Sequence, residues 1–162
     1  MSADADAEHK GSWPDLAGRI VADAEGRRHV LPVRVYFEDT DFSGLVYHAS
    51  YVRWCERGRS DFLRLLGNDH ASLMQGGAGR EAAAFVVRRM ALEYLHPARI
   101  DDVLEVTTRV RDIGAASLVL DQHISRDGRP VFEAVVTVVL ISSRGRVLRL
   151  AKTLRAAMAS QG

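Results

Sequence analysis

The sequence predicts an α+β domain in which an antiparallel sheet of five or six strands is wrapped around one long helix. Residues 47–66 carry the longest stretch in which apolar side chains recur with the 3.6-residue period of an amphipathic helix. Residues 84–150 carry strand patterns that are separated mostly by short turns. Short turns cannot join parallel strands, so we expect an antiparallel sheet. Because the helix is the one large element available to cover a sheet face, the sheet should curl around it.

The predicted helix has one apolar stripe with a glycine in its middle. The stripe comprises Tyr51, Trp54, Cys55, Gly58, Phe62, Leu65 and Leu66. A glycine inside a helix costs about 1 kcal/mol relative to alanine. Gly58 therefore predicts a close approach between the helix and the element that covers it. Gly67 and Asn68 are residue types that commonly end a helix.

Several segments carry the residue types and alternation of strands. The clearest alternation lies at 103–113, where apolar and polar side chains take turns. The strongest hairpin signal is Asp127-Gly128, which precedes an almost continuously apolar strand. The predicted strands are residues 30–37, 84–95, 103–113, 116–126, 131–141 and 147–150.

The chain is expected to form one domain with a tail at each end. Its 162 residues are enough to bury a single hydrophobic core. The N-terminal segment has no sustained period and at most a short helix at 15–24, while the last residues could form one at 152–158. A glycine-rich stretch at 68–80 is interpreted as a flexible connection, with an active-site lid as the alternative. The expected parts are a flexible N-terminal extension at 1–28, the domain at 29–151 and a C-terminal tail at 152–162.

Composition excludes several classes of function. The net charge of +1 gives no reason to expect nucleic acid or an anionic membrane as the main partner. The single cysteine, Cys55, excludes an intramolecular disulfide and a thiolate metal cluster, and its place in the apolar stripe predicts a small buried side chain. No run of about 18 apolar residues is present, so we expect no membrane span. The acidic N-terminus lacks the apolar core of a signal peptide, so we expect a cytoplasmic protein.

The candidate site is the acidic turn between the first strand and the helix. Asp39 and Asp41 precede a turn at Gly44, and His48 lies where the helix pattern begins. Carboxylates in this place can simply cap the helix and complement its dipole. They could also form a metal site with His48, although no further cluster of ligands completes the shell.

Two catalytic interpretations of the same turn are also open. An Asp-x-Asp sequence after an apolar strand is found in aspartyl-phosphate phosphatases, whose first aspartate is the nucleophile. That chemistry needs a parallel sheet, which the short turns disfavour. In the other interpretation, Asp41 attacks a carbonyl carbon or activates water. A backbone N–H at the start of the helix, around His48, would then polarise the carbonyl oxygen.

The acidic turn and the helix together resemble the active-site signature of the hotdog-fold 4-hydroxybenzoyl-CoA thioesterase family. Within that family the chain is most similar to the YbgC-type acyl-CoA thioesterases, which are associated with the Tol–Pal system. The resemblance extends over most of the chain, from about residue 30 to about residue 150. It is carried by residues 41–51 (DFSGLVYHASY), by Trp54, Glu56 and Arg59, and by the stretches 36–41, 85–90 and 93–106.

The resemblance implies a fold, a chemistry and an assembly. The residue that matches Asp41 is the family's catalytic carboxylate. The residue that matches His48 starts the helix and donates its backbone N–H to the thioester carbonyl, and its side chain helps to position substrate or water. The family needs no metal and no cofactor, because CoA is part of the substrate. The substrate-binding residues implied here are Gly44, Val46, Tyr47, Tyr51, Arg88 and Arg89, with the two arginines near the CoA phosphates.

We therefore predict an acyl-CoA thioesterase that releases a free carboxylic acid and CoA. The family pairs its subunits with active sites at the interfaces, so we expect a homodimer or a homotetramer. The alternative is a non-catalytic protein on the same scaffold that binds an acyl carrier protein or takes part in membrane assembly.

Overall fold

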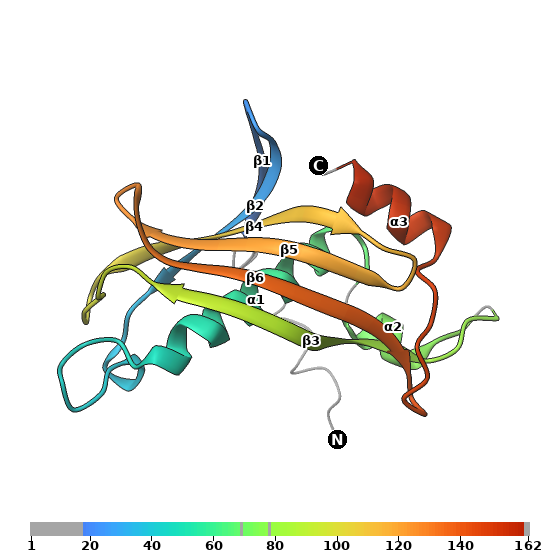
Figure 1. Cartoon of the computed structure of the whole chain (residues 1–162), viewed down its shortest axis with the longest axis horizontal. Coiled ribbons are helices and arrows are strands. Elements are labelled where there is room, and N and C mark those ends of the chain that lie inside the picture. Colours follow the sequence, from blue (N-terminus) through green and yellow to red (C-terminus); the bar gives the residue numbers. More distant parts are fainter. Residues whose placement is uncertain (1–17, 69, 78, 161–162) are drawn as a thin grey trace, which may run out of the picture.

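The computed structural model describes residues 18–68, 70–77 and 79–160, and Figure 1 shows one sheet with a long helix across one of its faces. The sheet is antiparallel throughout, in the order β1-β2-β4-β5-β6-β3. The predicted α+β class is confirmed. The strands are β1 (Arg19–Asp23), β2 (Gly26–Arg34), β3 (Ala83–Tyr94), β4 (Val103–Ile113), β5 (Ser117–Arg126) and β6 (Arg129–Ser142). The helices are α1 (His48–Leu65), α2 (His70–Gln75) and α3 (Lys152–Ala159).

Helix α1 packs tightly on the sheet because of Gly58. A Cβ atom added to Gly58 would lie 3.1 Å from Cγ1 of Val106 and 3.2 Å from Oγ1 of Thr108, both on β4. The predicted close approach is confirmed, and α1 starts and ends within one residue of the predicted helix at 47–66. Among the described residues, no helix is long and apolar enough to cross a membrane.

The hydrophobic core lies between α1 and the sheet. Its largest fully buried side chains include Trp54 and Phe62 of α1 and Leu104, Ile124 and Phe132 of the sheet. Burying a side chain of this kind contributes roughly 1.5–3 kcal/mol. Cys55 also lies in this core with no exposed surface, as predicted, and burial raises the pKa of its thiol to about 12.

A buried amide joins α1 to β5 across this core. Nε2 of Gln122 donates to the carbonyl oxygen of Cys55 and to Oγ1 of Thr108, each at 2.9 Å. Its Oε1 accepts from Nη1 of Arg59 at 2.8 Å. Since both ends of the amide are bonded, the cost of burying Gln122 is offset. The contact also fixes how α1 is rotated on the sheet.

The N-terminal end of the sheet differs from the prediction. Residues 19–28, expected in a flexible extension, form β1 and the start of β2, which project as a hairpin in Figure 1. The helix predicted at 15–24 is wrong from Arg19 on, and residues 15–17 lie outside the described part. The first core strand ends at Arg34 rather than at Phe37. Charges support the hairpin, because Asp23 pairs with Arg28 at 2.9 Å and with Arg109 at 2.5 Å.

Two further segments are more ordered than the sequence indicated. The stretch predicted as a loop at 68–80 contains α2. The predicted helix at 152–158 is present as α3, but it buries Leu154 and Met158 in the core instead of lying in solvent as a tail. The strand predicted at 147–150 is reduced to one bridge, between Ile141 and Val147.

Strand β3 forms one edge of the sheet, and among the described residues it pairs only with β6. A bulge between Val87 and Arg89 shifts its register. Several of its large hydrophobic side chains are exposed, namely Val86, Val87, Leu92 and Tyr94. The free edge therefore combines unpaired backbone groups with exposed apolar surface.

Candidate active site

The acidic turn is tied to both the sheet and the helix by backbone hydrogen bonds. A bridge joins Thr40 to Val46, and the N–H of Val46 donates to the carbonyl oxygen of Ala98 at 2.9 Å. The N–H of Tyr47 donates to the carbonyl oxygen of Asp39 at 2.8 Å. These hydrogen bonds fix the two ends of the turn in place, while the segment between them, residues 41–44, is exposed to solvent.

Asp39 has a structural role in this turn. Only 6% of its surface is exposed, and its Oδ2 accepts from the backbone N–H of Tyr36 at 2.9 Å. Its Oδ1 lies 3.9 Å from Nη2 of Arg53. A carboxylate that is buried and bonded in this way stabilises the turn but cannot approach a substrate.

Asp41 is exposed and ionised. Its Oδ1 accepts from the hydroxyl of Ser43 at 2.5 Å and from the N–H of Ser43 at 2.8 Å. These two hydrogen bonds, with a smaller contribution from nearby His48, hold the pKa of Asp41 below its usual range. Within the described residues Oδ2 has no hydrogen-bond donor, so one oxygen of the carboxylate is available to react.

The first turn of α1 offers backbone donors, and His48 at its start is near enough to affect the pKa of Asp41. Tyr47 is the N-cap residue, and it makes no side-chain capping bond. The N–H of Ser50 is used, because it donates to the carbonyl oxygen of Tyr47 at 2.8 Å. In the described part of the chain no acceptor is found for the N–H groups of His48 and Ala49. A helix start with open N–H groups favours a negatively charged oxygen.

A cavity of about 260 Å³ opens directly beside His48. It lies between the end of the acidic turn, the start of α1 and the segment that follows β3. Its lining is mainly apolar and aromatic, with two histidines. The lining residues are Leu45, Val46, His48, Tyr51, Tyr94, Leu95, His96 and Pro97.

Tyr94 and Tyr51 connect this cavity to the fold. The hydroxyl of Tyr94 donates to the carbonyl oxygen of His48 at 3.1 Å, and the hydroxyl of Tyr51 accepts from the N–H of Ala98 at 3.1 Å. The two rings meet edge to face with their centroids 5.6 Å apart, and both pack on Phe132. Burial raises the pKa of both phenols, so each hydroxyl remains protonated at neutral pH.

The structure brings three of the predicted site residues together around one cavity, while Asp41 lies outside its lining. Val46 and Tyr51 line the cavity beside His48, while Gly44 forms the tip of the acidic turn with a φ of +76°. The ring of Tyr47 lies 4.4 Å from that of His48. The other predicted pair, Arg88 and Arg89, is exposed at the β3 bulge and does not line this cavity.

Three residues that the sequence did not single out belong to the site. Ser43 orients Asp41, and Tyr94 and His96 line the cavity. Nδ1 of His96 donates to the carbonyl oxygen of Pro130 at 2.9 Å, which leaves Nε2 as an acceptor. Ser43 lies two residues from Asp41 and could have been found as a turn residue, because serine commonly bonds a nearby aspartate in turns.

The two other interpretations of the acidic turn find no support. Within the described residues, no three His, Cys, Asp or Glu side chains come together as metal ligands, and Asp39 is occupied by backbone contacts. The fully antiparallel sheet lacks the parallel strands on which an aspartyl-phosphate phosphatase depends.

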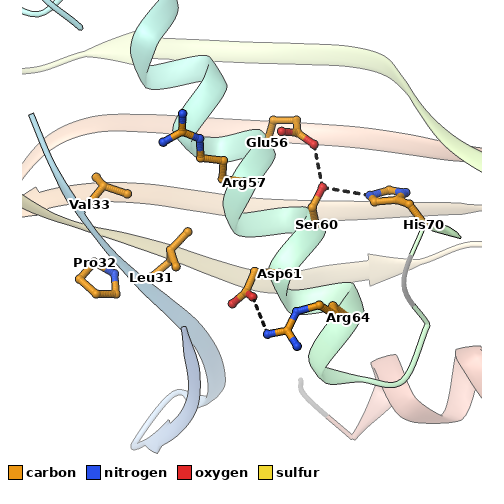
Figure 2. Close-up of a pocket in the computed structure, with 9 residues that line it drawn as sticks. All are labelled: Leu31, Pro32, Val33, Glu56, Arg57, Ser60, Asp61, Arg64 and His70. Carbon is orange, nitrogen blue, oxygen red and sulfur yellow. Dashed lines mark hydrogen bonds and ion pairs between the residues drawn. The ribbon is translucent and has the colours of Figure 1, made fainter. Parts of the chain in front are cut away.

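A larger cavity lies elsewhere. It measures about 520 Å³ between β2 and the solvent side of α1, and Figure 2 shows its lining. Neither Asp41 nor His48 reaches it. Its walls mix apolar residues of β2 with charged residues of α1, so size alone does not mark the reactive site.

The family follows from a comparison with known proteins. A model of the thioesterase-like superfamily matches residues 35–160. The chain belongs to this superfamily. The aspartate turn, the start of α1 and the cavity beside it all fall inside the matched region.

Individual members of the superfamily give a finer comparison. The acyl-CoA thioester hydrolase YbgC of Escherichia coli O6:H1 is 46% identical over 111 residues, which cover 68% of this chain and 79% of that protein. The acyl-CoA thioesterase YbgC of Haemophilus influenzae is 37% identical over 111 residues, which again cover 68% of this chain and 79% of that protein. A probable thioesterase from Bartonella henselae has a structure that superposes with a TM-score of 0.74 at 40% identity, covering 76% of this chain and 99% of that chain. The resemblance to YbgC thioesterases and the hotdog fold are confirmed.

Proposed function

We propose that this protein hydrolyses acyl-CoA thioesters and that Asp41 is the reacting carboxylate. The activity is supported by the superfamily match and by similarity to YbgC acyl-CoA thioester hydrolases. The observation that carries the residue assignment is the difference between the two aspartates of the turn. Asp39 is buried and bonded, whereas Asp41 is exposed and ionised beside open helix N–H groups.

The carbonyl oxygen of the thioester would lie at the start of α1. The N–H of His48 would donate to it, and the positive end of the helix dipole would stabilise the negative charge that develops there. The hydroxyl of Tyr94 holds the carbonyl side of His48 and so keeps this first turn in place. The thiol of CoA would then leave, and the acyl group would be released as a carboxylate.

Asp41 can act on the carbonyl carbon in two ways. Its free Oδ2 can attack directly and form an anhydride, or it can take a proton from a water molecule that attacks instead. A single turnover in ¹⁸O-labelled water tests direct attack, because label enters the Asp41 carboxylate only if an anhydride forms and water opens it at the Asp41 carbonyl carbon.

The acyl group is proposed to enter the cavity beside His48. At about 260 Å³ this cavity lies slightly below the range of roughly 300–1,000 Å³ that holds drug-sized ligands. Its aromatic walls suit a short or aryl acyl group better than a long chain. The CoA phosphates would remain outside, where Arg88 and Arg89 are exposed on the edge strand.

We also propose that two copies of the chain pair through β3. An exposed edge strand of 12 residues with apolar side chains is a template for strand addition. Pairing would join the two sheets and place each bulge, with its arginines, next to the other copy.

The test is a panel of short, aryl and long acyl-CoA substrates assayed on the wild type and on Asp41→Asn. We expect thiol release from the wild type and a loss of kcat of roughly 10²- to 10⁴-fold in Asp41→Asn. Asp41→Asn preserves shape but cannot accept a proton. Wild-type rates in the variant would contradict the role of Asp41. No turnover of any substrate, with tight binding to an acyl carrier protein, would favour the non-catalytic alternative.

A further inference from the structure

A separate cavity of about 120 Å³ lies under the second half of α1 and is lined by residues of α1, α2, β3, β5, β6 and α3. Most of its wall is apolar, with Phe62, Phe85, Leu118, Leu120, Val138 and Met158. Arg59 also lines it. Arg59 follows His48 by 11 residues, which is about 16 Å along the helix axis. No residue of the acidic turn reaches this cavity, so it is distinct from the candidate active site.

Arg59 is a partly buried cation with a neutral partner. Its hydrogen bond within the described residues is the one from Nη1 to Oε1 of Gln122, at 2.8 Å. Over the described residues no carboxylate oxygen lies within 4.0 Å of its guanidinium. Burial lowers the pKa of Arg59, and the smaller opposite effects of Cys55 and Glu56 offset this only in part, so the cation is buried at a net cost.

The guanidinium is held in place and left open on the cavity side. Gln122 is fully buried, and its amide is anchored on Cys55 and Thr108, so its Oε1 is fixed in the position that orients Arg59. Three side-chain atoms of the described residues are fully buried polar atoms without a hydrogen-bond partner, and none of them is a nitrogen of Arg59. The nitrogens of Arg59 that do not donate to Gln122 therefore keep accessible surface, and Arg59 can present further donors to a ligand.

Glu56, the acidic residue that lines the same cavity, is engaged at the rim. Figure 2 shows Glu56, Ser60 and His70 joined by dashed lines, and these three residues line both this cavity and the larger one. The hydroxyl of Ser60 donates to Oε1 of Glu56 at 2.7 Å. Since that hydroxyl has one hydrogen, Nε2 of His70, 3.0 Å away, must donate to Ser60. Glu56 thus belongs to the rim, where its charge acts on Arg59, but among the described residues the two form no direct ion pair.

We propose that this cavity binds a small organic carboxylate, with its carboxylate on Arg59 and its compact apolar body among the side chains of the cavity wall. A guanidinium and a carboxylate match in geometry and can form two parallel hydrogen bonds. An apolar cavity of roughly 150 Å³ holds benzene, so this cavity, at about 120 Å³, limits the apolar body to about a benzene ring at most and excludes an acyl-CoA. The inference concerns binding alone and does not rest on the proposed function. The acids released by thioester hydrolysis belong to this class of ligand.

Benzoate is the probe, titrated into the full chain carrying ¹³C-methyl methionine. Met158 lines the cavity, whereas Met74 is exposed on α2 and serves as the reference. We expect a saturable shift of the Met158 methyl resonance and none at Met74. Benzyl alcohol, of similar size but uncharged, should bind about tenfold more weakly or worse. No saturable shift at Met158, or equal binding of the alcohol, would overturn the proposal.

Three variants locate the interaction. Arg59→Met should weaken benzoate roughly tenfold to a hundredfold. Arg57→Met removes an exposed arginine that lines only the larger cavity and should change nothing. Asp41→Asn should also bind benzoate normally, and a loss there would show that benzoate occupies the proposed active site instead. If Arg59→Met does not fold, Arg59→Lys takes its place as the variant. The comparison of benzoate with benzyl alcohol on the wild type then also tests whether the charge of Arg59 is needed for binding.

Discussion

At the scale of single residues, the two aspartates of the acidic turn, which one residue separates, differ in burial and in hydrogen bonding. The backbone of the turn directs Asp39 inward, where the N–H of Tyr36 satisfies it. The carboxylate of Asp41 points outward and has only Ser43 as a hydrogen-bond partner within the described residues. Because a buried, bonded carboxylate is chemically inert, this difference in direction decides which of the two can react.

Ser43→Ala tests how Asp41 is tuned. Ser43 supplies the hydroxyl bond that does most to hold the pKa of Asp41 down. Without it the carboxylate is less stabilised, so its pKa rises toward the ordinary value. We expect the acidic limb of the kcat/KM profile to move to higher pH. Ser43→Thr keeps a hydroxyl and should restore the wild-type limb. An unmoved limb in Ser43→Ala would mean that another group sets it.

The sequence could predict only part of this site. Asp41 and His48 lie within one local motif, so their types and spacing are visible in the chain. Tyr94 and His96 reach His48 because the sheet register brings the end of β3 to the start of α1. No local pattern records that register. Arg88 and Arg89 were assigned by resemblance alone, and their place depends on a bulge that alternation does not reveal.

At the scale of elements, a buried histidine joins β2 to α1. Nε2 of His29 lies 2.6 Å from Oδ2 of Asp61. The same oxygen accepts from the N–H of Gly18 at 2.7 Å, so Asp61 also fastens the start of the N-terminal hairpin. Nδ1 of His29 is buried without a partner among the described residues. A proton on Nδ1 would therefore be a buried donor with no acceptor, which favours the neutral ring.

This pair predicts how stability depends on pH. Burial lowers the pKa of His29 below 6.5 and outweighs the opposite effect of Asp61. The unfolded chain then binds a proton more readily than the folded one, so the free energy of unfolding falls as the pH drops below about 6.5. Asp61 affects the free energy of unfolding at lower pH than His29 does. Burial raises the pKa of Asp61, but hydrogen bonds from His29, Gly18 and Arg64 lower it by more and leave it below 3.8.

Urea denaturation between about pH 7 and about pH 5 isolates the histidine. His29→Gln cannot take up the proton, so its free energy of unfolding should vary less over this interval than that of the wild type. His123→Gln is the matched control, because His123 is exposed on β5 near Glu133. An equal pH dependence in wild type and His29→Gln would show that His29 is not responsible.

The two elements that the sequence patterns did not predict, β1 and α2, have no periodic row of buried apolar side chains. In β1 the burial pattern has no fully buried position, and the strand is held by backbone pairing and ion pairs. Helix α2 has only six residues and likewise buries none of them fully. Elements of this kind are stabilised by tertiary contacts rather than by their own periodicity. By contrast, α1 and β4, with strong periods, were predicted to within one residue.

At the scale of the whole molecule, the sheet has a closed side and an open side. Helix α1 covers one face, while β3 leaves its edge and the exposed Val86, Val87, Leu92 and Tyr94 uncovered. A monomer that exposed such an edge would be prone to pair with other chains. This edge is the surface on which the proposed dimer rests.

Val86→Lys tests the proposed dimer. A lysine on the edge strand opposes pairing through charge repulsion and desolvation, and we expect the dimer to dissociate about tenfold more readily or worse. Analytical ultracentrifugation across a concentration series measures this. Val147→Lys changes a valine that is more exposed than Val86 and bridges to β6 rather than lying on β3, and it should leave assembly unchanged. A wild type that sediments as a monomer would contradict the dimer.

The burial of the single cysteine also has a practical consequence for labelling. Because Cys55 is sealed between α1 and the sheet and its pKa is raised to about 12, it has almost no thiolate at neutral pH. Thiol reagents should leave the native chain untouched and modify it only when α1 lifts from the sheet. Reaction kinetics with such a reagent would therefore report the opening rate of the core, and the wild type already serves as a silent background for probes attached elsewhere.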